Sequence, residues 1–364
     1  MTRPVALFFG TRPQVIKASI LREALASTGP VLAVDSGQHY DYQMHQVHYD
    51  QLGVRPPDAF LDVGSGSHAE QTGAILTACE TWIERHRPRV AVVIGDTNST
   101  LACALAAAKL RVPVVHVEAG LRASDRLMAE EVNRRVVDAI AEVLFAPCER
   151  VAAVLRRQYP DAAVETVGDV AHNVLRRALP RLAGLDAVPG YDPAWGKRFV
   201  YVTLHRAELV DDPDRLRAVM EALGRSPLPC LFAAHPRSAA ALGRLGLSAN
   251  GRVRVSAPVG YLESLALVRQ ATTVVTDSGG LQREAYWLGV PCVTVRNETE
   301  WVETVDLGAN RLLSPAQADA LPDLIGAAMR PRTDWDRTAY GDGHAAELIG
   351  ADVARRYASR IRSL

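Results

Sequence analysis

Short apolar runs, many of them β-branched, alternate along the chain with longer segments whose apolar positions recur at helical spacing. In the first half, strands are predicted at 5–9, 31–34, 89–94 and 114–117. Helices are predicted between and after them at 15–25, 70–87, 99–110 and 130–143. In the last of these, one buried face is predicted to consist of Val132, Val136, Ile140 and Leu144, with the alternative that 143–146 continues as a strand.

The second half repeats this alternation. Its strands are predicted at 199–203, 230–234, 253–256, 273–276 and 292–295, with helical segments between them. Continuously apolar strands separated by helices are typical of parallel sheets that are covered on both faces. Each half holds about five or six such units, so two doubly wound α/β domains of Rossmann type explain the pattern better than one very wide sheet.

The boundary between the two domains is predicted in residues 180–197, where prolines and glycines interrupt any sustained period. This gives an N-terminal domain at 1–180 and a C-terminal domain at 197–350. A last helix is predicted at 345–361, and we expect the segment 351–364 to pack back on the N-terminal domain.

Composition narrows the class of protein. The 41 basic and 41 acidic residues balance, which argues against a nucleic-acid partner. No apolar stretch approaches the length of a membrane span, and the run at 4–9 is too short for a signal-peptide core. The five cysteines are scattered and never form a CxxC pair, which indicates a reducing compartment and no structural zinc. We therefore expect a cytoplasmic protein without a membrane partner.

Small or chemically active residues follow nearly every predicted strand. In open parallel sheets, ligands bind beyond the carboxyl ends of the strands, so these residues would converge on one cleft if the two sheets face each other. They are Gly10-Thr11-Arg12-Pro13 with Lys17, Gly37-Gln38-His39, Gly95-Asp96-Thr97, His116-Val117-Glu118-Ala119-Gly120, His205-Arg206, His235-Pro236, Asp277-Ser278-Gly279-Gly280 and Arg296-Asn297-Glu298.

The segment Asp277-Ser278-Gly279-Gly280 is the strongest local signal. Glycines let a backbone approach a ligand closely, and the helix that follows offers unpaired N–H groups and a partial positive charge. These features predict a phosphate site, with Glu284 one turn later placed to bind ribose hydroxyls. A Ser or Asp helix cap is the alternative. No GxGxxG motif follows the first strand and no GxxxxGK[ST] motif occurs, so NAD and P-loop interpretations lose support.

The other candidates also have structural alternatives. Asp96 could cap the helix that follows it, and Glu118 could be a surface residue. Glu130 and Arg134 have the i,i+4 spacing of a solvated pair. His39 and His235 could be structural histidines. No HxxxH spacing occurs, so metal-dependent hydrolysis lacks support.

Taken in order, these motifs resemble the non-hydrolysing UDP-N-acetylglucosamine 2-epimerase family, whose two domains have the GT-B architecture. The resemblance covers nearly the whole chain and also includes Glu130-Glu131 with Asn133-Arg134, Gln282, and Tyr340-Gly341-Asp342-Gly343. Several segments resemble the branch that contains UDP-2,3-diacetamido-2,3-dideoxyglucuronate 2-epimerases, namely Arg12-Pro13-Gln14, Gln38-His39-Tyr40-Asp41, 203–208 and Glu298-Thr299-Glu300-Trp301.

The resemblance implies interconversion of UDP-GlcNAc and UDP-ManNAc by elimination and re-addition of UDP, without a metal or redox cofactor. It implies Asp96, Glu118, Glu130 and His205 as catalytic residues. It implies that substrate is bound by Arg12, Lys17, His235, Ser278, Gly279, Gly280 and Glu284. It also suggests a homodimer. Alternatives are a diacetamido-uronate substrate, a GT-B glycosyltransferase, a hydrolysing epimerase and a non-catalytic sugar-nucleotide sensor.

One departure limits what the resemblance implies. Tyr40-Asp41-Tyr42 differs from the Arg-containing segment at which some bacterial members of the family bind a second UDP-GlcNAc as an activator. We therefore do not predict that form of allostery.

Overall fold

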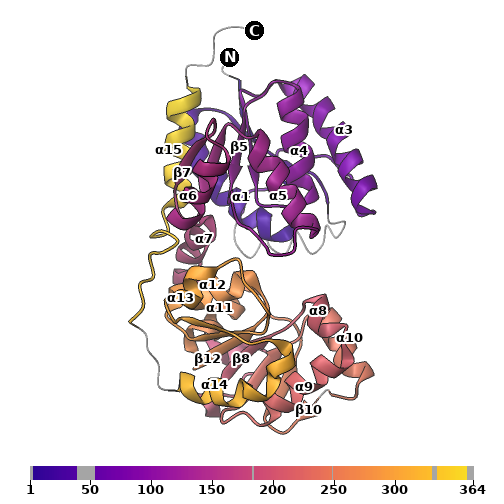
Figure 1. Cartoon of the computed structure of the whole chain (residues 1–364), viewed down its shortest axis with the longest axis vertical. Coiled ribbons are helices and arrows are strands. Elements are labelled where there is room, and N and C mark those ends of the chain that lie inside the picture. The colour runs from indigo at the N-terminus through magenta and orange to yellow at the C-terminus, as the bar shows by residue number, and fades with distance from the viewer. Residues whose placement is uncertain (1–2, 39–53, 183, 248, 330–333, 359–364) are drawn as a thin grey trace. The chain divides into compact units, whose positions relative to one another are not determined.

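The computed structural model describes residues 3–38, 54–182, 184–247, 249–329 and 334–358. The chain forms two compact units (Figure 1): unit 1 comprises Met1–Arg176 and Thr338–Leu364, and unit 2 comprises Arg177–Arg337. This division differs from the boundary predicted at 180–197 and from the predicted domain end at 350. The Pro- and Gly-rich segment is part of unit 2, because Leu185 and Val188 are buried in that unit's core.

Unit 1 is built on a seven-stranded sheet in the order β3-β2-β1-β4-β5-β6-β7. All of its strand pairs are parallel, as predicted. Its strands are β1 (Val5–Phe9), β2 (Val31–Asp35), β3 (Ala59–Phe60), β4 (Val90–Ile94), β5 (Val114–Val117), β6 (Val143–Ala146) and β7 (Ala163–Thr166). Its helices are α1 (Arg12–Leu25), α3 (His68–His86), α4 (Asn98–Lys109), α5 (Ala129–Ile140), α6 (Glu149–Gln158), α7 (Val170–Ala178) and α15 (Ala345–Tyr357).

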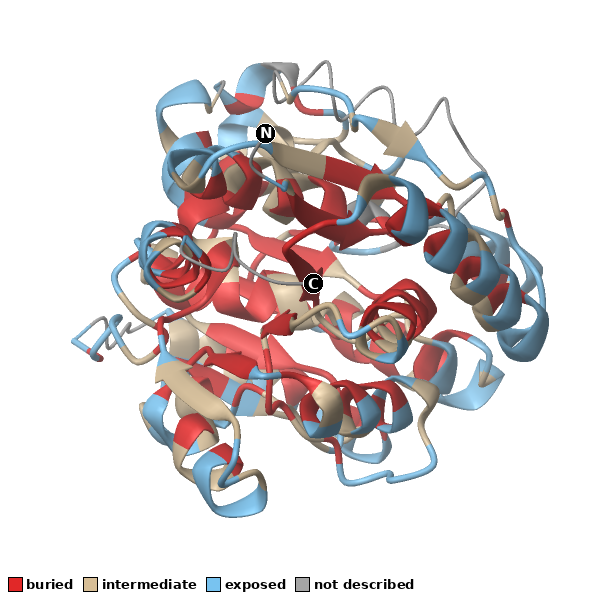
Figure 2. Ribbon diagram, turned by 90° about the horizontal axis from the view of Figure 1, so that it is seen from above, coloured by how far each residue is buried: buried red, intermediate tan, exposed pale blue. Residues whose placement is uncertain are grey.

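Both faces of this sheet are buried, since successive side chains of a strand point to opposite faces. Val5, Leu7 and Phe9 of β1 belong to one apolar cluster, which includes residues of α1 and α15. Ala6 and Phe8 belong to a second cluster, which includes residues of α3 and α4. The central strands accordingly appear mostly in red in Figure 2, while the outer helix faces are pale blue.

The chain returns to unit 1 at its C-terminal end, where α15 packs against α1 (Figure 1). The contact is close at Gly350, where an added Cβ would lie 2.6 Å from the carbonyl oxygen of Ala24. The predicted last helix therefore lies on the N-terminal unit but ends at Tyr357, and residues 359–364 are outside the described part.

Unit 2 is built on a second seven-stranded sheet, in the order β10-β11-β9-β8-β12-β13-β14. Its strands are β8 (Val200–Thr203), β9 (Cys230–Ala233), β10 (Ala249–Asn250), β11 (Val253–Ser256), β12 (Thr273–Thr276), β13 (Cys292–Thr294) and β14 (Asn310–Leu312). Its helices are α8 (Ala207–Val210), α9 (Pro213–Gly224), α10 (Pro236–Arg244), α11 (Tyr261–Gln270), α12 (Gly279–Leu288), α13 (Val302–Asp306) and α14 (Leu321–Ala328). The edge strand β10 is antiparallel to β11, whereas the prediction was a parallel sheet.

Short 3₁₀ helices complete the description: η1 (Ala26–Thr28), η2 (Leu179–Arg181), η3 (Leu185–Ala187), η4 (Pro193–Trp195) and η5 (Pro315–Ala320). In both sheets the strand order reverses beside the first strand, between β1 and β4 in unit 1 and between β8 and β12 in unit 2. Such a switch point is where doubly wound sheets bind ligands.

Helix α5 differs from its prediction in length and in orientation. It ends at Ile140, and Leu144 belongs to β6. Val132 and Val136, which were predicted to be buried, are 45% and 37% exposed. The face of α5 that is buried carries polar side chains instead, among them Glu131, Arg134 and Asp138.

Candidate functional site

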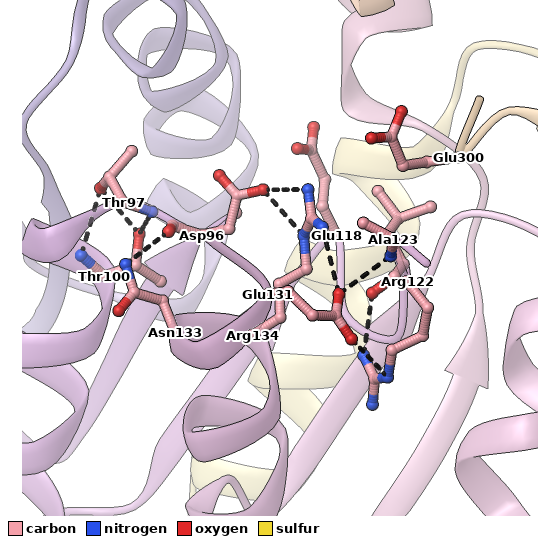
Figure 3. Close-up of polar contacts among 12 residues, drawn as sticks. Asp96, Thr97, Thr100, Glu118, Arg122, Ala123, Glu131, Asn133, Arg134 and Glu300 are labelled. Carbon is pink, nitrogen blue, oxygen red and sulfur yellow. Dashed lines mark hydrogen bonds and ion pairs between the residues drawn. The ribbon is translucent and has the colours of Figure 1, made fainter. Parts of the chain in front are cut away.

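Asp96 lies in the turn after β4, beside the switch point of unit 1. It does not cap α4, because Thr97 holds the N-cap position and its side chain accepts the amide hydrogen of Thr100. The Asp96 carboxylate instead contacts Arg134 of α5, with Nε 2.8 Å and a terminal nitrogen 2.5 Å from Oδ2 (Figure 3). Asn133 donates to the Asp96 carbonyl at 2.8 Å. Helix α5 therefore holds both the side chain and the backbone of Asp96.

Glu118 follows β5 and forms an ion pair with Lys17 of α1, with 2.5 Å between Nζ and Oε1. Its side chain is 9% exposed, so the alternative of a solvated surface glutamate does not apply. Its φ is +65°, a left-handed value that costs a residue other than glycine about 1–3 kcal/mol. Such strain is concentrated at functional sites, and it supports Glu118 as a functional residue.

The paired acids at the start of α5 have different environments. Glu130 is exposed in the first turn. Glu131 is fully buried, and it accepts the amide hydrogen of Ala123 at 3.0 Å and a hydrogen from Arg134 (Figure 3). It also accepts from Arg135. Glu130 is thus accessible to a ligand, while Glu131 anchors the helix.

Arg134 was interpreted from sequence as one partner of a possible solvated pair with Glu130. Its described contacts are with Asp96 and Glu131, and the residue is buried. Spacing places Glu131, Arg134 and Asp138 on one face, because they recur at i, i+3 and i+7, but it does not show that this face is buried. The hydrophobic pattern instead predicted that the apolar positions of this helix are buried in the core, so the polar face was expected to be exposed.

In unit 2, Asp277 follows β12 and organises the loop after β8. Its Oδ2 accepts the amide hydrogens of His205 and Arg206, each at 2.8 Å. Its Oδ1 lies 3.1 Å from Nδ1 of His205. Asp277 is fully buried, while the side chain of His205 is 42% exposed. The buried acid therefore fixes an accessible imidazole.

The segment Ser278-Gly279-Gly280 starts α12. Ser278 is the N-cap, and its hydroxyl accepts the amide hydrogen of Leu281 at 3.4 Å, so the capping alternative describes that side chain. The first turn of α12 contains no acidic residue, so no carboxylate within that turn offsets the partial positive charge of the helix N-terminus. Glu284 is half-buried one turn later. This geometry suits a phosphate group.

The remaining candidates are placed as follows. His235 is the N-cap of α10 and accepts the amide hydrogen of Arg237, which matches its structural alternative, and its ring lies 6.0 Å from that of His205. Arg12 begins α1, but its side chain is outside the described part of the structure, as are His39 and the segment Tyr40-Asp41-Tyr42. Within the described residues, no group of three or more His, Cys, Asp or Glu is placed to hold a metal ion.

The sequence profile of the UDP-N-acetylglucosamine 2-epimerase family matches residues 26–353. The chain belongs to this family. A relative from Pseudomonas aeruginosa named UDP-2,3-diacetamido-2,3-dideoxy-D-glucuronate 2-epimerase is 38% identical, with 96% of this chain and 99% of the relative covered. A UDP-N-acetylglucosamine 2-epimerase from Methanococcus maripaludis is 34% identical, with 95% and 96% covered.

A solved structure gives the same result. The Methanocaldococcus jannaschii UDP-GlcNAc 2-epimerase, determined in complex with UDP-GlcNAc and UDP, has a TM-score of 0.85 and 34% identity, with 97% of this chain and 99% of that chain covered. This similarity confirms the predicted fold class of two Rossmann-like domains of GT-B type. No helix in the described ranges has the length and apolarity that crossing a bilayer requires.

Proposed function

We propose that this protein is a UDP-N-acetylglucosamine 2-epimerase that interconverts UDP-GlcNAc and UDP-ManNAc. The observation that carries the proposal is the pair of carboxylates, Asp96 and Glu118, that follow adjacent strands of unit 1 in a chain of this family. Each is held by a cation from its own unit, Arg134 or Lys17. Epimerisation at one carbon requires a base that removes its proton and an acid that returns one, and two fixed carboxylates can serve in these roles.

The hydrogen on C2 of the sugar is not next to a carbonyl group, so enolisation is not available. We propose instead that a base removes the C2 proton while the C1–O bond breaks and UDP leaves, which gives 2-acetamidoglucal. An acid then delivers a proton to C2 from the opposite face, and the same UDP oxygen bonds again to C1. Asp96, Glu118 and Glu130 are the proposed acid–base groups.

The leaving diphosphate has to be stabilised and retained, or it would escape as a hydrolysis product. We propose that Arg12, His205 and the amides of 278–280 hold it, and that Glu284 binds the ribose. His235, whose ring lies beside that of His205, is proposed to contribute to this binding. The proposal requires both units to act on one substrate molecule.

The test is turnover of UDP-GlcNAc in D2O with no acceptor present. We expect UDP-ManNAc to form, with deuterium at C2 in both epimers. Turnover only after an acceptor is added would indicate a glycosyltransferase, and release of free ManNAc with UDP would indicate a hydrolysing epimerase. If UDP-GlcNAc is not converted with or without an acceptor, the result would indicate a non-catalytic sugar-nucleotide sensor.

A second candidate substrate is UDP-2,3-diacetamido-2,3-dideoxyglucuronate, which the 38% identical relative from P. aeruginosa favours. The same D2O assay distinguishes the two candidates when both sugars are supplied side by side. If kcat/KM is at least tenfold higher for the uronate, the uronate is the substrate instead of UDP-GlcNAc. The proposed elimination and re-addition of UDP would be unchanged.

We also propose a homodimer that works in the cytoplasm. The exposed apolar side chains Val132 and Val136 on α5, with Leu127 just before it, support a protein–protein contact on unit 1. Sedimentation velocity tests the dimer, and Val136→Glu is expected to shift it to monomer. All five cysteines are free and buried, which fits a reducing compartment.

A further inference from the structure

His116 of β5 is fully buried, and both of its ring nitrogens face acceptors. Nδ1 lies 2.7 Å from Oδ1 of Asp138, and Nε2 lies 2.7 Å from the carbonyl oxygen of Gly95. A carbonyl oxygen can only accept, so Nε2 must carry a hydrogen. If Asp138 is ionised, its oxygen also can only accept, and Nδ1 must carry a second hydrogen.

The contacts of Asp138 are those of an ionised carboxylate. Its Oδ2 accepts from Arg122 at 2.8 Å and from the amide of Gly120 at 3.2 Å. Desolvation acts to raise the pKa of Asp138, but the hydrogen bonds and charges of His116 and Arg122 outweigh it and lower that pKa. An ionised Asp138 can only accept from Nδ1 of His116, so the contact geometry places a hydrogen on both nitrogens of that ring.

Arg122 continues the contacts toward Asp96. Its Nε lies 3.9 Å from Oε1 of Glu131, and Oε2 of Glu131 lies 3.3 Å from Arg134, which holds the Asp96 carboxylate (Figure 3). Opposite charges thus alternate from Asp96 to His116, which contacts the carbonyl of Gly95, the residue next to Asp96. We call this closed set of contacts the charge ring, and its members are Asp96, Arg134, Glu131, Arg122, Asp138, His116 and the Gly95 carbonyl.

We propose that His116 is a positioning residue for the epimerisation: as a buried imidazolium it fixes the Gly95 carbonyl and thereby orients the Asp96 carboxylate. This inference rests on the proposed function, because it gives His116 a role through Asp96. Gly95 has a φ of +68°, a left-handed value that glycine adopts without strain, in the turn that carries Asp96. His116 of β5 fixes the position of the Gly95 carbonyl in this turn. The charge ring then holds Asp96 by its backbone and its side chain together.

Two substitutions separate the two contacts of His116. The amide nitrogen of asparagine is placed like Nδ1, so His116→Asn keeps a donor to Asp138 and loses the one to Gly95. The amide nitrogen of glutamine is placed like Nε2, so His116→Gln keeps a donor to Gly95 and loses the one to Asp138. A role through the Gly95 carbonyl predicts that glutamine rescues activity and asparagine does not.

The experiment measures kcat and KM of both variants and of the wild type on UDP-GlcNAc and on the diacetamido-uronate analogue. We expect His116→Asn to lower kcat roughly 10–100-fold with KM within about threefold, and His116→Gln to keep kcat within about threefold of the wild type. An asparagine variant as active as the glutamine variant, or a loss confined to KM, overturns the positioning role. An inactive wild-type enzyme would instead remove the proposed function.

A second measurement needs no variant to be active. In ¹⁵N NMR of the wild-type protein, we expect both ring nitrogens of His116 to carry a hydrogen, because each faces an acceptor. The signal is assigned by its loss in either variant, or by its coupling to β5 backbone resonances if neither folds. A neutral ring with one bare nitrogen overturns the inference, whatever the kinetics.

Discussion

The two units have closely similar sheets but hold their strand-end residues by different means. In unit 1, charged partners hold the acids: Arg134 holds Asp96, and Lys17 holds Glu118. In unit 2, Asp277 accepts two backbone amides, and the Ser278 loop offers the start of a helix. An ion pair fixes a carboxylate that has to exchange a proton with the substrate. Backbone N–H groups at a helix start suit a ligand anion, such as a phosphate, that only has to be bound. The comparison predicts chemistry in unit 1 and binding in unit 2.

The largest effect is expected when the acids of unit 1 are neutralised. Asp96→Asn and Glu118→Gln keep size and lose the proton-transfer group, so each should lower kcat by about 10²–10⁴-fold. Deuterium exchange at C2 of UDP-GlcNAc is the measurement. Glu80→Gln, a neutralised exposed acid on α3, is the matched control and should be unchanged. Full activity of both site variants would remove the proposed roles.

A second prediction concerns the helix that returns to unit 1. Gly350→Ala forces a methyl group to within 2.6 Å of the Ala24 carbonyl, so we expect a loss of about 1–3 kcal/mol in the free energy of unfolding. Gly326→Ala in α14 of unit 2 is the control, because no atom lies within 4 Å of the added group there. That control should gain about 0.4–1 kcal/mol. Calorimetry measures both, and equal changes would show that α15 is not closely packed.

A third prediction tests the binding role proposed for unit 2. In Asp277→Asn one oxygen remains to accept the amides of His205 and Arg206, so the loop after β8 should persist. We expect UDP affinity to fall by about tenfold, equivalent to one hydrogen bond of roughly 1.4 kcal/mol, with kcat nearly unchanged. Titration calorimetry with UDP measures it. A large loss of kcat at constant affinity would place proton chemistry in unit 2 and contradict the comparison.

The smallest effect is expected on acidification. Burial acts to raise the pKa of Glu300, but its hydrogen bonds and ion pair with Arg296 lower that pKa below the ordinary value of 4.5. A carboxyl whose pKa is lower in the folded state adds stability above its unfolded pKa and loses it as pH falls through the folded pKa. Between pH 7 and about pH 5.5 the Glu300 contribution should therefore be constant, and it should decline below about 4.5.

Hydrogen exchange of unit 2 at pH 7 and pH 4 measures this decline. Glu300→Gln should lose less protection on acidification than the wild type, because the glutamine does not titrate. Asp138 in unit 1 has a lowered pKa for the same reason and gives the same sign there. A protection that rises as pH falls would contradict both assignments.

Sequence was sufficient for most of the parallel strands and for most strand ends, because continuous apolar runs and the residues that follow them are local signals. The short strands β3, β7, β10 and β14 were not predicted. Asp96, Glu118, His205 and Ser278 all follow strands as predicted. The predicted orientation of helix α5 was wrong. Its apolar residues Val132 and Val136 are exposed, and its polar face is buried.

Periodicity could not reveal this reversal, since a regular stripe shows that a helix has two faces but not which of them the protein buries. The buried polar face is stable only because partners from distant strands satisfy it, as His116 does for Asp138 across 22 residues. Those partners are set by tertiary structure. The irregular segment 180–197 shows the same limit, because its composition suggested a linker while its side chains complete the core of unit 2.

The position of α15 has a consequence for biosynthesis. Ala346, Ile349 and Val353 lie in the same apolar cluster as Leu7 and Leu21, so that cluster is incomplete until the ribosome has made the last helix. Unit 2 has its strands by residue 312 and its core helix α14 by residue 328, so it can fold before α15 is made. We therefore expect unit 2 to complete its folding before unit 1 does. Until α15 is made, unit 1 would expose an apolar surface to which a chaperone could bind.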